Sequence, residues 1–294
     1  MQMDLDCIPC FVQQAIRAAR HVSDDPDVQE RIVREALCCI GAVDFREPPP
    51  PRASQIFYRR LSEITGIPDL YQADKDRQNR LALKLLPALK EQIGISHDPL
   101  LLAARLAIAG NIIDLGANGN LTVADIHTAV VQALNEQLVG DWEKFKSAVS
   151  EARDILYLAD NAGEIVFDRL LIEQILPKPV TLVVRGAPTI NDALQTDAKA
   201  AGLDKLVDII DNGSDAPGTL LGDCSREFLR CFATADLIIA KGQGNYETLC
   251  NEPRNIFFLF KIKCQVIARH IGHPVGTQVL LKSNEIQPEN RGIH

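Results

Sequence analysis

The stretch Ile155-Leu-Tyr-Leu-Ala-Asp-Asn-Ala-Gly-Glu164 decides the fold of this chain. Its leading apolar residues predict a buried strand, Gly163 permits a tight turn, and Glu164 stands where the first turn of a helix favours a carboxylate. The amphipathic run Ile165 to Leu176 follows, so the segment predicts a strand, a short acidic turn and a helix. In an open parallel sheet such a turn lies at the carboxyl end of a strand, where ligands bind.

Asp160 and Asn161 stand next to each other in this turn. Their carboxylate and amide oxygens are hard ligands that suit a divalent cation. Residues of these types also cap the N-termini of helices, which is their commoner role. The stretch alone leaves both interpretations open.

Composition and charge exclude several classes of protein. A hydrophobic content of 46% and a charged content of 24% over 294 residues are typical of a globular protein with one elaborated α/β domain or two domains. The net charge of -8, without a strong cluster of Lys or Arg, argues against a nucleic-acid partner. Asp4 and Asp6 stand where a signal peptide is cationic, and no apolar stretch reaches membrane-spanning length, so we expect a cytoplasmic protein.

The first half of the chain has apolar residues at three- and four-residue spacing, which predicts helices. Asp98 before Pro99 is a helix start signal, and Pro48–Pro51 predict an extended corner before the third helix. The predicted helices are Cys7–His21, Asp27–Ile40, Gln55–Thr65, Asp74–Ile93, Pro99–Ile113, Val123–Val139 and Trp142–Ala152.

After Asp154 strand-like runs alternate with helical stretches. The predicted strands are Ile155–Ala159, Val180–Val184, Leu206–Ile210, Leu237–Ala240, Ile256–Phe260 and Gln278–Leu281. The predicted helices between them are Ile165–Leu176, Asp192–Ala201, Ser225–Ala233 and Lys263–Ile271. Such alternation predicts an α/β fold, with a helical domain over residues 1–152 and a Rossmann-like domain with a mainly parallel sheet over residues 153–294.

Chemically active side chains follow four of the predicted strands. They are Asp160 and Asn161 after the first, Arg185 with Asn191 and Asp192 after the second, Asp211 and Asn212 after the third, and Lys241 after the fourth. Their convergence on one edge favours a ligand site. Asp192 is the best third metal ligand, although an N-cap of the next helix is the alternative. Oxygen ligands without His or Cys select Mg²⁺ or Mn²⁺ over structural zinc.

The run Lys241-Gly-Gln-Gly-Asn245 predicts a phosphate-binding turn. Gly242 and Gly244 let the backbone approach a ligand closely, and Lys241 offers a point charge suited to phosphate. The run matches neither the Walker loop nor the dinucleotide fingerprint. Glycine-rich turns after strands are often only turns, so the phosphate-binding interpretation depends on the position of this run at the predicted site.

Two further motifs have open roles. Asn111 and Asp114 lie one helical turn apart and could reach the cleft from the helical domain, or could be ordinary polar groups at a helix end. Cys7 and Cys10 have zinc-ligand spacing but no matching second pair, with Cys264 a plausible addition. The eight cysteines are too sparse for a disulfide scaffold, and buried thiols are the default interpretation.

Taken in order, Asp160-Asn-Ala-Gly-Glu164, Asn191-Asp-Ala193 and Lys241-Gly-Gln-Gly-Asn245 resemble the family called domain of unknown function 89, described as metal-dependent, ARMT-like damage-control phosphatases. The resemblance covers nearly the whole chain, including Gly110–Asp114 and the Cys7-x-x-Cys10 opening of one subgroup. It implies a helical domain packed on a Rossmann-like α/β/α domain. It also implies a Mn²⁺, Co²⁺, Ni²⁺ or Mg²⁺ ion held by Asp160, Asn161 and Asp192.

The activity that the resemblance implies is hydrolysis of small phosphorylated metabolites, including sugar phosphates and damaged phosphopantetheine compounds. The expected catalytic residues are Asp160, Asp192, Lys241 and Asp114. The expected substrate-binding residues are Lys241, Gly242, Gly244, Asn245, Asn111, Arg185 and Glu164. Asp114 and Glu164 are candidate bases, and attack by Asp160 itself is a competing route.

Two other functions remain as alternatives. One is an S-adenosylmethionine-dependent carboxyl methyltransferase. Such an enzyme needs a glycine-rich turn after the first strand, whereas Asp160–Glu164 has one glycine and two acids that would repel the ligand's carboxylate. The other is a non-catalytic protein that binds a metal or a phosphorylated metabolite.

Overall fold

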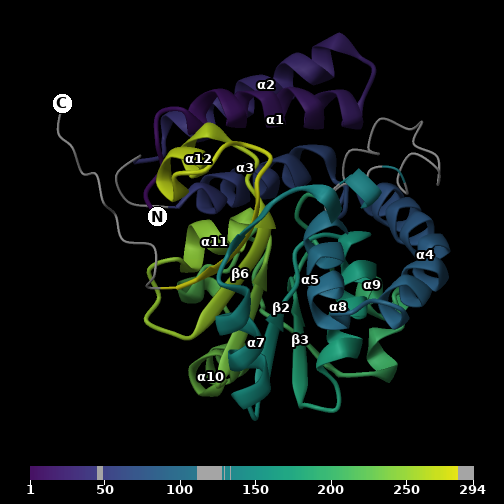
Figure 1. Cartoon of the computed structure of the whole chain (residues 1–294). Helices are drawn as coiled ribbons and strands as arrows, with labels where there is room; N and C mark the ends of the chain where they lie inside the picture. The colour runs from purple at the N-terminus through teal and green to yellow at the C-terminus, as the bar shows by residue number, and fades with distance from the viewer. Residues whose placement is uncertain (45–48, 111–127, 129, 133, 284–294) are drawn as a thin grey trace.

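The computed structural model describes residues 1–44, 49–110, 128, 130–132 and 134–283 (Figure 1). Its first elements are α1 (Cys7–Val22), α2 (Pro26–Gly41), α3 (Pro50–Thr65), α4 (Gln72–Gly94) and α5 (Pro99–Ala109). Pro26 and Pro99 open their helices, and the side chains of Asp25 and Asp98 accept hydrogen bonds from the first-turn amides of Asp27 and Leu101. The helical first half is thus confirmed over these elements.

Two local predictions in this half are wrong. Helix α3 begins at Pro50, not Gln55, because proline at the first helical positions needs no N–H partner and presets the helical φ angle. Of the predicted extended corner, Pro49 is extended as the residue before the helix, Pro50 and Pro51 are helical, and Pro48 lies outside the described residues. In the predicted helix Val123–Val139, residues 123–127, 129 and 133 lie outside the described residues, and residues 128, 130–132, 134 and 135 are helical. Leu138 and Val139 at its end belong instead to strand β1 (Leu138–Gly140).

Within the described ranges, seven strands form one sheet with the order β1-β7-β6-β5-β2-β3-β4. After β1 these are β2 (Ile155–Leu158), β3 (Val180–Val184), β4 (Asp208–Asp211), β5 (Leu237–Lys241), β6 (Ile256–Lys261) and β7 (Gln278–Lys282). Strands β6 and β7 pair antiparallel and the other neighbours pair parallel. The mainly parallel sheet is therefore confirmed. Strand β1 precedes residue 153 yet pairs with β7, and the domain division after residue 152 stays a prediction.

Helices cover both faces of the sheet. They are α7 (Trp142–Glu151), α8 (Glu164–Ile175), α9 (Gln195–Ala200), α10 (Arg226–Thr234), α11 (Gln243–Leu249) and α12 (Gln265–Ile271). One apolar core joins α4, α5, α7, α8 and α9 to one face, and a second joins α10, α11 and α12 to the other. Central strand β2 is buried over its whole length, as expected for a strand covered on both sides.

Strand order reverses between β2 and β5, which makes their carboxyl ends the expected ligand crevice. Helix α3 lies over this edge, because Gln55 and Arg59 donate hydrogen bonds to Asp215 in the segment after β4. In Figure 1, α1 and α2 lie side by side beyond α3, on the far side from the sheet. In the described part of the chain, no helix is both long and apolar enough to cross a membrane.

Candidate functional site

The turn after β2 holds its polar side chains in a compact cluster. Asp160 and Asn161 are 8% and 5% exposed, so both are nearly inaccessible to solvent. Asn161 Nδ2 donates to Asp160 Oδ2 at 2.7 Å and to Glu164 Oε2 at 3.1 Å. Since the amide nitrogen serves both carboxylates, its oxygen is the atom of Asn161 that can bind a cation.

The segment after β3 lies directly against this turn. Asn161 and Asp192 form an isolated antiparallel bridge, Ala162 N–H donates to the Asn191 carbonyl at 2.9 Å, and Ala193 N–H donates to the Asp160 carbonyl at 2.8 Å. The predicted ligand set Asp160, Asn161 and Asp192 is therefore brought together from two loops. Asp192 does not cap the next helix, because α9 begins three residues later at Gln195.

Arg185 joins the two loops through its guanidinium group, which is 3% exposed. Its Nε donates to Asp192 Oδ2 at 2.7 Å, and a terminal nitrogen lies 3.7 Å from Asp160 Oδ1. The other terminal nitrogen donates to Asn245 Oδ1 at 3.3 Å. A buried cation thus stands between the carboxylates that the sequence predicted as metal ligands.

The segment Gly242–Asn245, which the sequence predicted as a phosphate-binding turn, is instead the residue before α11 and the first turn of that helix, and it packs against the same cluster. Gly242 has a φ angle of +82°, and a Cβ atom added to it would lie 2.0 Å from Asp160 Oδ2, so only glycine fits there. Asn245 is 0% exposed and donates to the carbonyls of Lys241 and Ala159, while its Oδ1 accepts from Arg185 and Thr219. Gly242 therefore accommodates Asp160, and Asn245 positions Arg185. The substrate-binding roles of Gly242, Gly244 and Asn245 stay predictions.

Lys241 points away from this turn and into the protein. It is 0% exposed, and its Nζ donates to Glu164 at 2.8 Å, to Asp168 at 2.5 Å and to the Ala107 carbonyl at 2.8 Å. Tyr157 donates its hydroxyl to Asp168 at 2.8 Å. The exposed point charge expected for phosphate is thus absent here, and the phosphate-binding role of Lys241 stays a prediction.

Asp168 is a member of this network that the sequence interpretation missed. It follows Glu164 by four residues in α8, so both carboxylates lie on the same helix face and meet Lys241 there. That spacing is the signal that could have found it. Burial raises the pKa of Asp168 to about 6, although the nearby Lys241 ammonium opposes the rise.

The cluster around Asp160 carries excess negative charge. Burial, together with the nearby carboxylates of Glu164 and Asp192, raises the pKa of Asp160 well above its ordinary value. Arg185 and Lys263 oppose this rise, but do not cancel it. Among the described residues, no group of three or more His, Cys, Asp or Glu side chains is arranged to hold a metal ion, and the predicted set consists of two carboxylates and one amide.

The remaining candidates lie elsewhere or outside the described residues. Asn111 and Asp114 are outside them, so their roles stay predictions. Cys7 and Cys10 are in the first turn of α1, and Cys264 immediately precedes α12 and accepts a hydrogen bond from Gln243 at 3.5 Å. Burial and the charges of Glu247 and Cys264 raise the pKa of Cys7 to about 11, so its thiol is protonated at neutral pH.

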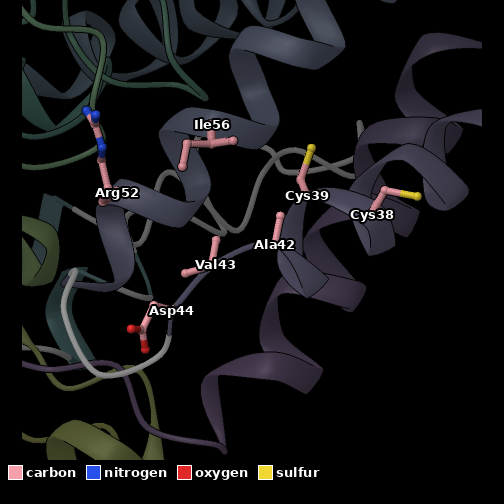
Figure 2. Close-up of a pocket in the computed structure, with 7 residues that line it drawn as sticks. All are labelled: Cys38, Cys39, Ala42, Val43, Asp44, Arg52 and Ile56. Atoms are coloured by element: carbon pink, nitrogen blue, oxygen red, sulfur yellow. The ribbon is translucent and has the colours of Figure 1, made fainter.

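A separate pocket of about 730 Å³ opens between α2 and α3 (Figure 2). Its lining residues are Cys38, Cys39, Ala42, Val43, Asp44, Arg52 and Ile56. None of the predicted ligands Asp160, Asn161 and Asp192 borders it. The pocket is therefore distinct from the site built on the carboxyl edge of the sheet.

Known proteins match this chain over nearly its full length. The family model described as the damage-control phosphatase ARMT1-like domain matches residues 3–279. A protein of Archaeoglobus fulgidus named damage-control phosphatase is 36% identical over 279 residues, covering 93% of this chain and 96% of its own. A damage-control phosphatase of Pyrococcus horikoshii is 33% identical over 289 residues, covering 96% of this chain and 99% of its own.

The fold also matches a solved structure. The crystal structure of a DUF89 family protein from Pyrococcus horikoshii has a TM-score of 0.89 and 33% sequence identity, and the match covers 96% of this chain and 99% of that one. The family model, the relatives and the solved structure thus agree over both halves of the molecule. The chain belongs to the DUF89 family, whose domain is described as damage-control phosphatase ARMT1-like.

Proposed function

We propose that this chain is a metal-dependent phosphatase that hydrolyses phosphomonoesters of small metabolites, such as sugar phosphates or phosphopantetheine-type compounds, in metabolite repair. Two relatives that cover nearly the whole chain are named damage-control phosphatases. The observation that carries the proposal is the meeting of Asp160, Asn161 and Asp192 on adjoining loops beside Arg185. A buried charged cluster of this kind suits a phosphate ester and the ion that neutralises it.

The residues present fit a divalent cation. The buried carboxylates around the site are Asp160, Glu164, Asp168 and Asp192, whereas the buried cations among them are Arg185 and Lys241. Buried charge without a counterion is costly, which is why the pKa of Asp160 is raised. Oxygen ligands favour Mg²⁺ or Mn²⁺, and the family resemblance adds Co²⁺ and Ni²⁺.

Asp160, Asn161 and Asp192 would hold this ion, which when bound polarises a phosphoryl oxygen and lowers the pKa of a water molecule. Arg185 is already fixed by Asp192 and Asn245, and its planar guanidinium suits the oxygens of a phosphoryl group. Helix α8 begins at Glu164, beside the site, so its N-terminal dipole adds positive potential there. The chain therefore binds and orients an anion largely through groups already held in place.

The step that breaks the ester has two routes. In one, a base such as Glu164 or Asp114 takes a proton from an attacking water. In the other, Asp160 attacks and forms a phosphoaspartate that water then hydrolyses. An acid quench of a single turnover with a substrate labelled in its phosphoryl group separates them, because the second route leaves the labelled phosphoryl group on the Asp160 carboxylate, whereas direct attack by water never labels the protein.

The proposal is tested by a screen of metals against phosphomonoesters, run beside the Asp160→Asn variant and a chelated control. We expect phosphate release with Mn²⁺ or Co²⁺, and a loss on the order of 100-fold or more in the variant, beyond what removal of an outer partner costs. Full activity in the variant would contradict the site. A metal-loaded protein that released no phosphate would favour the non-catalytic binding protein.

A further inference from the structure

A side chain of helix α4 reaches the turn that carries Asp160. The backbone N–H of Gly163 donates to Asn79 Oδ1 at 2.7 Å, across 84 positions of sequence. Gly163 has φ +75° and ψ -53° and is the residue before α8, and no side chain caps that helix locally. A buried N–H needs a partner, and here the partner comes from the helical region of the chain.

The other end of the same amide binds the segment after β3. Asn79 Nδ2 donates to Asp197 Oδ1 at 2.7 Å, and the second oxygen of Asp197 accepts from the backbone N–H of Leu194 at 2.9 Å. Leu194 follows Asp192 by two residues. Asn79 therefore contacts the Asp160 loop directly and the Asp192 loop through Asp197, which lies in the first turn of α9.

The orientation of the Asn79 amide is determined by its partners. A backbone N–H can only donate and an ionised carboxylate can only accept, so the amide oxygen must face Gly163 and the nitrogen must face Asp197. Lys75, one turn earlier in α4 and 0% exposed, lies 3.8 Å from Asp197 and 2.6 Å from Asp69. Its positive charge supports the ionised form of Asp197.

Burial makes this arrangement rigid. Asn79 and Asp197 are 3% and 1% exposed, so water cannot easily replace either bond. Outer partners of metal ligands fix ligand orientation, and their loss typically costs about 10- to 100-fold in metal affinity or activity. Asn79 is placed to fix the orientation of the whole Asp160 loop, rather than of one metal ligand.

We propose that Asn79 is a positioning residue that sets the spacing between the Asp160 loop and the Asp192 loop, and so the geometry of the predicted metal site. The inference rests on the proposed function. It assigns a role in the site to helix α4, which supplies none of the residues that the sequence motifs indicated.

The test compares Asn79→Leu with wild type and with Leu89→Ala, which removes a buried side chain 10 residues along the same helix. Leu89 serves as a matched control for general damage to α4. We expect Mn²⁺ affinity, measured by calorimetry, to fall about 10- to 100-fold in Asn79→Leu and to stay within about twofold of wild type in Leu89→Ala. Equal affinity in Asn79→Leu and wild type would overturn the proposal.

A second variant covers the case in which Asn79→Leu does not fold. Asn79→Asp keeps an acceptor for Gly163 N–H but sets a carboxylate against Asp197, so it should be no more stable than Asn79→Leu and yet bind Mn²⁺ more tightly. A purely structural role would instead make affinity follow stability across the variants. That outcome would also overturn the proposal.

Hydrogen exchange separates this inference from the proposed function. In metal-free protein, peptides spanning residues 159–166 should exchange about five- to tenfold faster in Asn79→Leu, because the Gly163 bond is lost, and should be unchanged in Leu89→Ala. Unchanged exchange in Asn79→Leu would refute the positioning role. If wild type bound no Mn²⁺ and released no phosphate, the proposed function would fail, and the exchange result alone would decide the positioning role.

Discussion

Two neighbouring clusters at the carboxyl edge of the sheet use the same types of residue in opposite ways. In the closed cluster of Lys241, Glu164, Asp168 and Tyr157, a cation and a hydroxyl are bonded to the carboxylates. In the open cluster of Asp160, Asn161, Asp192 and Arg185, the one cation bonds only Asp192 of the two acids, because Arg185 lies 2.7 Å from Asp192 but 3.7 Å from Asp160, and the pKa of Asp160 is raised well above its ordinary value. We therefore expect the closed cluster to stabilise the fold and the open cluster to suit a ligand that supplies positive charge.

Replacement of Lys241 should give the largest effect and tests this division directly. Lys241→Met leaves Glu164 and Asp168 buried without their cation, and such a loss costs about 3–5 kcal/mol in the free energy of unfolding. Urea unfolding of the metal-free protein measures it. The added change Asp168→Asn should recover part of the loss, since it removes one uncompensated charge.

The same variant can also refute the closed cluster. If Lys241 binds phosphate, as its sequence context predicts, Lys241→Met would leave the free energy of unfolding nearly unchanged and raise KM for the phosphomonoester. A change below about 1 kcal/mol, the size of an exposed pair, would support that role instead.

The pH dependence of stability should give the next effect. The pKa of Asp168 is about 6 in the folded protein against an ordinary 3.8, so the folded state holds its proton to higher pH than the unfolded chain does. The free energy of unfolding of the metal-free protein should therefore fall as pH rises from about 4 to about 6, by roughly 2–3 kcal/mol from this group.

Lys241 does not alter that pH window, because its raised pKa affects stability only at strongly alkaline pH. Asp168→Asn is the control, since it removes the titrating group and should flatten the curve between these pH values. Stability in wild type that rises over the same window would contradict the assignment of a raised pKa.

The alternation of side chains along β5 predicts which face of the sheet Lys241 occupies. In β5, Leu237 and Ile239 pack in the core beside α5 and α8, whereas Ile238 and Ala240 pack in the core beside α10, α11 and α12. Because side chains alternate along a strand, Lys241 shares the face of Leu237 and Ile239. The sequence analysis grouped Lys241 with the glycine-rich run that follows it, and therefore did not identify Glu164 and Asp168 as the partners of Lys241.

The fold and the site were predictable to different extents. The spacing of hydrophobic residues along the sequence predicted most of the strands and helices. The proximity of Asp160, Asn161 and Asp192 was predicted because the carboxyl ends of parallel strands meet at one edge of the sheet. Strand β1 was missed because a three-residue strand at an edge leaves almost no periodic signal beside a helical run. Asn79 was missed because its partners, Gly163 and Asp197, are joined to it only by the tertiary fold.

Gly242 offers a smaller test of how the open cluster is packed. Gly242→Ala forces a positive φ angle and a contact 2.0 Å from the Asp160 carboxylate, so it should destabilise the protein and displace a predicted ligand. Gly272→Ala is matched in backbone angle, with φ +84° against +82°, but its Cβ would meet nothing within 4 Å. The difference between the two variants isolates the contact with Asp160.

We expect Gly242→Ala to lose about 1–3 kcal/mol of unfolding free energy more than Gly272→Ala, and to bind Mn²⁺ more weakly. Urea unfolding and calorimetry measure the two quantities on the same preparations. Equal losses in the two variants would mean that Asp160 moves aside without cost, and the open cluster would then be less ordered than its hydrogen bonds indicate.

Asp160→Asn should have the smallest effect on stability, with a sign opposite to that of Lys241→Met. In metal-free protein it removes a charge that burial, Glu164 and Asp192 disfavour, while an amide oxygen can still accept the hydrogen bond from Asn161. We expect a gain of about 1 kcal/mol, equivalent to a rise of roughly 2 °C in Tm, as at sites where function conflicts with stability.

Saturating Mn²⁺ should reverse this ranking, because a ligand that binds only the folded state stabilises the protein in proportion to its affinity. Wild type would then unfold at the higher temperature, and Asp160→Asn would respond little to the ion. Calorimetric scans with and without Mn²⁺ measure both parts. A variant less stable than wild type without metal would show that Arg185 and Asn161 already compensate the Asp160 charge, and the open cluster would then resemble the closed one.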